Sequence, residues 1–182
     1  MTPRARMALA MRHREPDRVP VMCQLALGHY FLQAGLDPVD VWHDTPAFAD
    51  ALVRLQQRYG FDGILVNLPG REPEWRRHVA AVERSPGARR VRWRDGLVTV
   101  APDDDNPHVF TEGGAAPARP ALGDVDPDRL LYVEPHDRTG VRPLDSFPPW
   151  QDATVRAVRE RAPDVSVHAE VFSPFKIGRA SC

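Results

Sequence analysis

The clearest element in the hydrophobic pattern is an amphipathic helix over residues 45–59. Apolar side chains recur there at three- and four-residue spacing and so line one face of a helix, namely Phe48, Ala51, Leu52, Leu55 and Tyr59. Thr45-Pro46 is typical of a helix start, and Gly60 is typical of a helix end. We therefore expect this helix to pack one face against a hydrophobic core.

Three shorter apolar runs predict β-strands at 19–25, 61–68 and 165–171. The first two runs are largely apolar, as in strands that are buried on both faces, although Pro20 limits the first to an early or edge position. The third run alternates, which places Ser166, His168 and Glu170 on one face and the valines with Ala169 on the other.

Helices are also predicted between and before these strands, at 2–11, 29–34, 37–42 and 150–161. Strands and helices that alternate in this order belong to the α/β class and form parallel sheets through right-handed crossovers. The pattern fits an open doubly wound sheet or the beginning of an eight-stranded barrel. The loop after the first strand has a single glycine, Gly28, and lacks a Gly-rich phosphate loop, which disfavours the nucleotide-binding open sheet.

An antiparallel insertion interrupts this order after the second strand. Residues 90–94 and 97–100 alternate around Asp95-Gly96, which is a strong hairpin signal, and 109–110 is expected to add a third strand. We place the inserted β-hairpin at about 89–110, followed by an irregular segment over 112–128. His43, in contrast, is expected to be a solvated surface residue.

Charge and composition exclude several classes of protein. The net charge is -1, and the arginines are spread along the chain, so there is no basic footprint for nucleic acid. The apolar runs are too short to span a bilayer, so we expect no membrane partner. Cys23 and Cys182 do not make a disulfide framework. We expect a cytoplasmic protein.

The last residues do not continue any earlier pattern. Lys176 is the single lysine of the chain, and residues 177–182, Ile-Gly-Arg-Ala-Ser-Cys, are what a common sequencing adapter encodes in one frame. We therefore expect 176–182 to be an artefact and the natural protein to continue beyond Phe175.

Ligands of parallel α/β folds bind at the carboxyl ends of the strands, which selects six candidate binding residues. These are Gln24, His29, Tyr30, Asn67, His168 and Glu170.

Each candidate has a structural alternative. His29 and Tyr30 can simply pack a helical turn, and Asn67 can cap one. His168 and Glu170 can serve proton transfer or a metal, or can form a polar layer inside a barrel. These two ligand types fall short of the three or four that zinc takes, so no metal ligand set is expected within the sequence given.

Residues 14–70 resemble the N-terminal part of the uroporphyrinogen decarboxylase (URO-D) superfamily. The resemblance rests on the Pro-Asp-Arg-x-Pro-Val pattern at 16–21, on Gly28-His29-Tyr30, and on a long helix that leads into Phe61-Asp62-Gly63. Residues 170–175 are similar to that family's exit from the third strand. The resemblance implies a single (β/α)8 barrel of the TIM type with its active-site cleft at the strand ends, of which 1–175 would be a partial domain.

Two departures from the family's decarboxylases favour another branch. Those enzymes carry Arg-Gln-Ala-Gly-Arg-Tyr after the first strand, where this chain has Leu25 and His29 in place of the two arginines. A leucine cannot provide a bidentate clamp for substrate carboxylates. The decarboxylases also place an aspartate at the end of the second strand, where this chain has Asn67.

The resemblance therefore points to the cobamide-dependent methyltransferase-like members. It implies zinc and a corrinoid for the full-length parent, with metal ligands beyond the sequence given. The partners it implies are a small-molecule, tetrapyrrole or corrinoid substrate and a corrinoid protein. The fragment alone is expected to be inactive. Two alternatives stay open: uroporphyrinogen decarboxylation in porphyrin biosynthesis, and a non-catalytic binding module.

Overall fold

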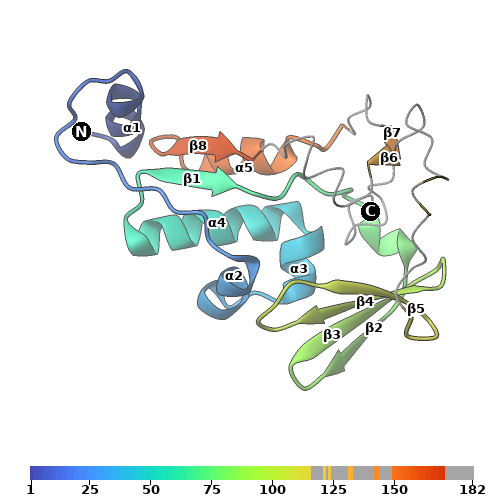
Figure 1. Ribbon diagram of the computed structural model, residues 1–182. Helices are drawn as coiled ribbons and strands as arrows, with labels where there is room; N and C mark the ends of the chain where they lie inside the picture. Colours follow the sequence, from blue (N-terminus) through green and yellow to red (C-terminus); the bar gives the residue numbers. More distant parts are fainter. Residues whose placement is uncertain (116–120, 122, 124–130, 133–141, 144–148, 171–182) are drawn as a thin grey trace.

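A computed structural model describes residues 1–115, 121, 123, 131–132, 142–143 and 149–170 (Figure 1). Its helices are α1 (Pro3–Met11), α2 (Leu27–Ala34), α3 (Pro38–His43), α4 (Thr45–Tyr59), the 3-10 helix η1 (Trp75–His78) and α5 (Ala153–Arg161). Its strands are β1 (Gly63–Val66), β2 (Val79–Ser85), β3 (Ala88–Trp93), β4 (Leu97–Pro102), β5 (His108–Thr111), β6 (Leu131–Tyr132), β7 (Arg142–Pro143) and β8 (Ser166–Ala169). The protein is of the α/β class, as predicted.

The core of the molecule lies between helices and the parallel pair β1–β8. Ile64 pairs with Val167 and Val66 with Ala169. α4 packs against α5 and β1, and α5 packs against β8. Buried apolar residues of α2, α3, α4, α5 and β1 form one continuous cluster there. The parallel arrangement predicted for the second and third strands is confirmed, and within the described residues β1 and β8 form an open two-stranded sheet.

Local signals place the helices correctly. The predicted helix 45–59 is α4 with the same bounds, and its amino end is capped by Asp44, whose carboxylate accepts from the Ala47 amide. Thr2 and Asp37 cap α1 and α3 in the same way. Gly60 ends α4 with a φ of 70°, in the left-handed region that glycine adopts without strain.

The predicted first strand, 19–25, is wrong. These residues are not in a strand, and Val19 and Val21 are 80% and 48% exposed rather than buried. The segment runs beside the start of β1, where the Asp62 amide donates to the Val21 carbonyl at 2.7 Å. Pro20 has no amide hydrogen, and the Val21 amide donates to the Asp62 side chain, so a regular ladder does not form.

The insertion is a four-stranded antiparallel sheet in the order β2-β3-β4-β5. The hairpin at Asp95-Gly96 and the third strand at 109–110 are confirmed as β3, β4 and β5. The predicted start at about 89 is too late, because β2 begins at Val79. β2 is exposed along almost its whole length, so it lacks the alternation that marks a half-buried strand.

A second small core joins this sheet to the rest of the protein. It contains Val39 of α3, Trp75 of η1, Val91 and Trp93 of β3, and Ala101 of β4. The Trp93 indole donates to the Thr99 hydroxyl at 2.8 Å. His43 is buried between Trp75 and Trp93, with ring centroids 4.7 and 5.2 Å away, so its predicted surface position is wrong.

Two sequence expectations lie largely outside the described residues. These are the irregular segment 112–128, most of which is not described, and the C-terminal residues 171–182 with Val171 and the expected artefact. Among the helices that the structure describes, none combines the length and apolar character needed to cross a membrane.

Candidate functional site

One face of the β1–β8 pair turns away from the helices and carries the polar residues. Ile64, Val66 and Val167 belong to the helix-facing core. Because side chains alternate along a strand, their neighbours lie on the opposite face. That face carries Gly63, Leu65 and Asn67 from the first segment and Ser166, His168 and Glu170 from the second.

Three predicted residues meet at the carboxyl ends of the two strands. The Gln24 side-chain amide donates to the Glu170 carboxylate at 3.1 Å. Glu170 follows β8, and its own amide donates to the Val66 carbonyl at 3.0 Å, which places it beside Asn67. We call Gln24, Asn67 and Glu170 the carboxyl-end cluster.

Asn67 contributes an acceptor to this cluster that has no partner in the described structure. Its Nδ2 lies 3.5 Å from the Leu25 carbonyl, at the limit of a hydrogen bond, whereas its buried Oδ1 accepts no hydrogen bond. A buried acceptor without a donor is costly, and it favours a ligand that brings an N–H or O–H group. The cluster is thus suited to binding hydrogen-bond donors beside a carboxylate.

His168 lies on the same face, one step closer to the amino end. Its Nε2 is 2.9 Å from the Ser166 hydroxyl, a contact that the sequence reasoning did not predict. The two side chains are neighbours on one face of β8, at positions i and i+2. His168 and Glu170 therefore share a face, as predicted, and a role for His168 in proton transfer stays a prediction.

His29 and Tyr30 make packing contacts away from the carboxyl-end cluster. His29 Nε2 is 2.9 Å from the Tyr59 hydroxyl at the end of α4. Tyr30 is buried, and its ring meets Phe48 edge-on with centroids 5.4 Å apart. Burial raises the pKa of the Tyr30 hydroxyl above its ordinary value. These contacts are those of the structural alternative, the packing of a helical turn.

Gly28, between Gln24 and His29, marks where the inserted sheet approaches α2. A Cβ atom on Gly28 would lie 2.3 Å from the backbone oxygen of Asp104, in the connection between β4 and β5. The glycine of the Gly28-His29-Tyr30 motif is therefore required by a close backbone approach.

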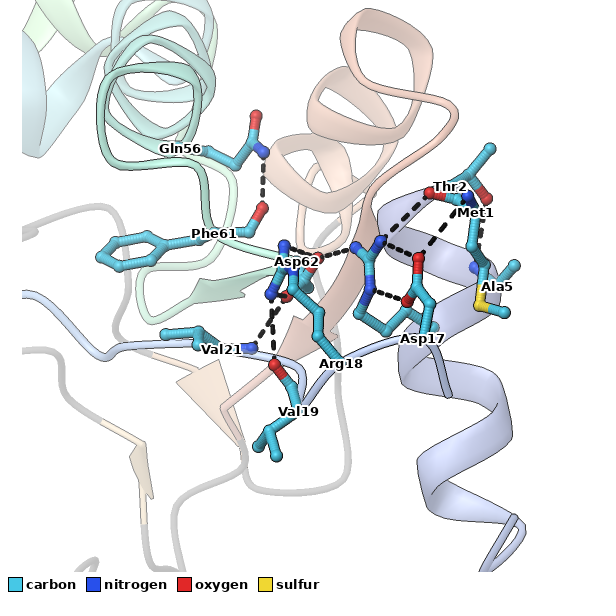
Figure 2. Close-up of polar contacts among 11 residues, drawn as sticks. Met1, Thr2, Ala5, Asp17, Arg18, Val19, Val21, Gln56, Phe61 and Asp62 are labelled. Carbon is cyan, nitrogen blue, oxygen red and sulfur yellow. Dashed lines mark hydrogen bonds and ion pairs between the residues drawn. The ribbon is translucent and has the colours of Figure 1, made fainter. Parts of the chain in front are cut away.

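At the opposite, amino end of β1, a buried ion-pair network was missed by the sequence reasoning (Figure 2). Asp62 is completely buried, and its carboxylate accepts from Arg6 at 2.5 Å, from Arg18 at 2.7 and 2.9 Å, and from the Val21 amide at 2.9 Å. Arg6 also forms a fork with both oxygens of Asp17, at 2.5 and 2.8 Å. We call Arg6, Asp17, Arg18 and Asp62 the amino-end network.

Hydrogen bonding decides the charge of the two carboxyl groups in this network. The hydrogen bond from Arg6 holds the pKa of Asp17 well below its ordinary value. Burial alone would raise the pKa of Asp62, but the hydrogen bonds from the Val21 amide, Arg6 and Arg18 outweigh it, so that this pKa is lowered as well. Both carboxylates therefore stay ionised at neutral pH.

Two further buried charges lie between β1 and the inserted sheet. The Arg71 guanidinium donates to the Trp42 carbonyl at 2.8 Å, and the Arg71 amide donates to the Thr45 hydroxyl at 2.8 Å. Glu72 contacts Arg77 and accepts from His78 at 3.1 Å. Both residues thus fix the chain where it leaves the parallel pair.

The described ranges do not contain a group of three or more histidine, cysteine, aspartate or glutamate side chains placed to hold a metal ion. Comparison of the chain with protein-family models, with curated proteins and with solved structures finds no match in any of the three.

Proposed function

We propose that the chain is the N-terminal part of a URO-D superfamily enzyme of the methyltransferase-like branch, and that β1 and β8 are neighbouring strands of its (β/α)8 barrel. The observation that carries the proposal is the amino-end network. It joins the Pro-Asp-Arg segment, through Arg18, to the Phe-Asp-Gly segment, through Asp62. The two sequence motifs of the resemblance are thus physically one unit.

The arrangement of β1 and β8 supports the barrel. In a (β/α)8 barrel, helices cover the outer face of parallel strands and the inner face opens to the site at their carboxyl ends. Here α4 and α5 cover one face, and the carboxyl-end cluster lies at the end of the other. In such barrels the carboxyl ends of the strands carry the binding groups, and the amino ends contribute to stability. The polar cluster at one end of β1 and β8 and the ion pairs at the other end agree with that division.

The chemistry of the cluster favours methyl transfer over decarboxylation of a polycarboxylate. Leu25 packs against the main core, and His29 faces Tyr59, so neither replaces the lost arginine clamp. Gln24, Asn67 and Glu170 supply no basic group to the cluster, so these three residues offer no cation to a substrate rich in carboxylates.

Zinc and a corrinoid would have to be held mainly by other parts of the parent enzyme. The described residues do not fit a zinc site by themselves, because they do not supply three ligands in one place. We therefore assign to the carboxyl-end cluster a role in binding substrate only.

The test uses the intact reading frame that contains this sequence. We expect the purified enzyme to transfer the methyl group of methylcobalamin to a small thiol, which is measured as the loss of methylcobalamin absorbance. We expect a zinc chelator to abolish this transfer. Decarboxylation of uroporphyrinogen that is insensitive to the chelator would contradict the assignment and favour the decarboxylase. If the protein consumed neither methylcobalamin nor uroporphyrinogen but bound one of them tightly, the non-catalytic binding module would be favoured.

Within that enzyme, Glu170→Gln is expected to lower kcat/KM for the substrate by about 10-fold or more, because a charged hydrogen-bond partner is lost from the cluster. The matched control is Glu160→Gln, which removes the same charge from the exposed surface of α5. Equal kcat/KM values for the two variants would show that Glu170 does not contribute to substrate binding.

A further inference from the structure

The outer edge of β2 is an exposed strand edge in the inserted sheet. Every residue from Ala80 to Ser85 is exposed, and Val82 keeps 44% of its surface accessible. β2 is the first strand in the sheet order, and in Figure 1 β2 and β3 lie along the lower border of the molecule. Within the described part of the chain, no strand pairs with this side of β2.

The backbone of this edge offers hydrogen bonds to another strand. Ser85 and Ala88 flank the two-residue turn Pro86-Gly87, so they form the hydrogen-bonded pair that closes the hairpin. Because such pairs alternate along an antiparallel ladder, the amide and carbonyl groups of Val82 and Arg84 point outward. Neither proline nor lysine occurs within β2 to block its use, and the irregularity in its pairing is confined to the first residues, 79–81.

We infer that this edge pairs with β2 of a second copy of the chain, antiparallel and centred on Val82. In that register Val82 meets Val82 of the second copy. Ala81 meets Glu83 of the second copy, and Arg84 faces the irregular start of β2 near Ala80. Glu83 therefore meets an alanine, and like charges do not face each other across the twofold axis.

Charges on the outer face of the sheet complement this register. Arg92 lies beside Ala81 in the ladder and now contacts Glu83 of its own chain at 3.7 Å and Glu112 at 2.8 Å. Arg90 lies directly opposite Glu83 and makes no ion pair with the described residues. In the dimer, Arg90 forms an ion pair with Glu83 of its own chain. Arg92 extends past the small Ala81 and forms an ion pair with Glu83 of the second copy. An acidic peptide would instead meet Glu83 on the strand that receives it, which makes a second copy the better occupant.

The central test is sedimentation velocity of the 182-residue chain at concentrations up to about 100 µM, where weak dimers are populated. We expect a dimer whose dissociation constant rises about 30-fold in Val82→Lys, because a valine contact is replaced by two like charges at the axis. Leu32→Lys is the control, since Leu32 is an exposed apolar residue of α2 outside the sheet. Circular dichroism melts show whether both variants stay folded.

The register is tested by opposite charges at Ala81. Ala81→Glu, placed against Glu83 of the second copy, is expected to weaken the dimer by about 3-fold or more. Ala81→Lys is expected to leave the dimer nearly unchanged, because the lysine replaces Arg92 as the partner of that Glu83. A wild-type chain that is monomeric at the highest concentration overturns the inference. So does an oligomer that survives Val82→Lys, or one that responds equally to both Ala81 variants. The outcome is independent of whether the parent enzyme transfers methyl groups.

Discussion

Replacing Asp62 by asparagine is expected to lower the free energy of unfolding by about 3 kcal/mol. The Asp62 carboxylate is completely buried and accepts hydrogen bonds from two arginines and one backbone amide. Without this carboxylate, Arg6 keeps Asp17 as its partner, but Arg18 and the Val21 amide lose their acceptor. Breaking a buried ion pair costs about 3–5 kcal/mol, and the half-exposed Arg18 places this case at the lower end. The NH2 group of the asparagine would also face the guanidinium N–H groups, so that donor would meet donor. Urea unfolding followed by circular dichroism measures the loss.

Asp17→Asn is the matched control for this change, because it removes a carboxylate from the same network at a half-exposed position. Its effect is expected to be clearly smaller, since water can solvate the groups left behind. Equal losses for the two variants would show that burial of Asp62 is not what gives the network its strength.

The network also predicts the direction of acid sensitivity. The pKa values of Asp17 and Asp62 are lowered in the folded chain, so the folded state binds fewer protons than the unfolded state at these groups. Their contribution to stability is present above the ordinary carboxyl pKa of about 4 and is lost as the pH falls below it. The stability of Asp62→Asn should therefore fall less steeply between about pH 4 and pH 2 than that of the wild type.

Replacing Gly70 by alanine is expected to cost about 3 kcal/mol or to prevent α5 from docking. A Cβ atom on Gly70 would lie 1.9 Å from the Trp150 carbonyl oxygen and 2.8 Å from the Ala153 Cβ. The Gly70 amide also donates to the Gln151 carbonyl at 3.0 Å, so the two backbones cannot separate without losing this bond. Such overpacking against backbone is relieved only by moving the helix. Thermal unfolding, with hydrogen exchange at α5 as the local readout, measures the effect.

Gly113→Ala is the control for this prediction. The nearest atom to a Cβ at that position is 3.9 Å away, and its backbone is outside the left-handed region, so the substitution should leave the melting temperature nearly unchanged. If Gly70→Ala leaves the melting temperature as unchanged as Gly113→Ala does, the backbone before α5 does not lie as close to Gly70 as described.

Local patterns carried the parts of the fold that could be predicted. The bounds of α4 follow from its apolar period, from Thr45-Pro46 at its start and from Gly60 at its end, all within the helix or next to it. The turn at Asp95-Gly96 is likewise decided by adjacent residues. The strand prediction for 19–25 is wrong because the apolar residues of the segment do not reveal that the Val21 amide donates to the Asp62 side chain. The sequence did not predict β2, because a strand that is exposed along its length has no apolar face to mark it.

The candidate site was predictable in position but not in its contacts. The rule that ligands bind at strand ends selected six residues, of which the fold brings Gln24, Asn67 and Glu170 together from segments up to 146 positions apart. Gln24 was selected as the end of a strand that does not form, and His29 and Tyr30 lie in packing contacts elsewhere. The pairing of Arg6 with Asp62 spans 56 positions, and arginine is common throughout the chain, so the sequence carries no signal for that choice. The requirement for Gly70 likewise arises from α5 and not from its own neighbours.

The separation between β1 and β8 has a consequence for how the chain folds. Val66 and Ser166 are joined by roughly 100 residues, and closing so long a loop costs more conformational entropy than closing the short turns of β2–β5. The antiparallel sheet has mostly local contacts and can form on the microsecond scale of hairpins, whereas the parallel pair must wait for α5 to be made and to return. During synthesis on the ribosome, the inserted sheet is therefore complete while the residues of the carboxyl-end cluster are still apart.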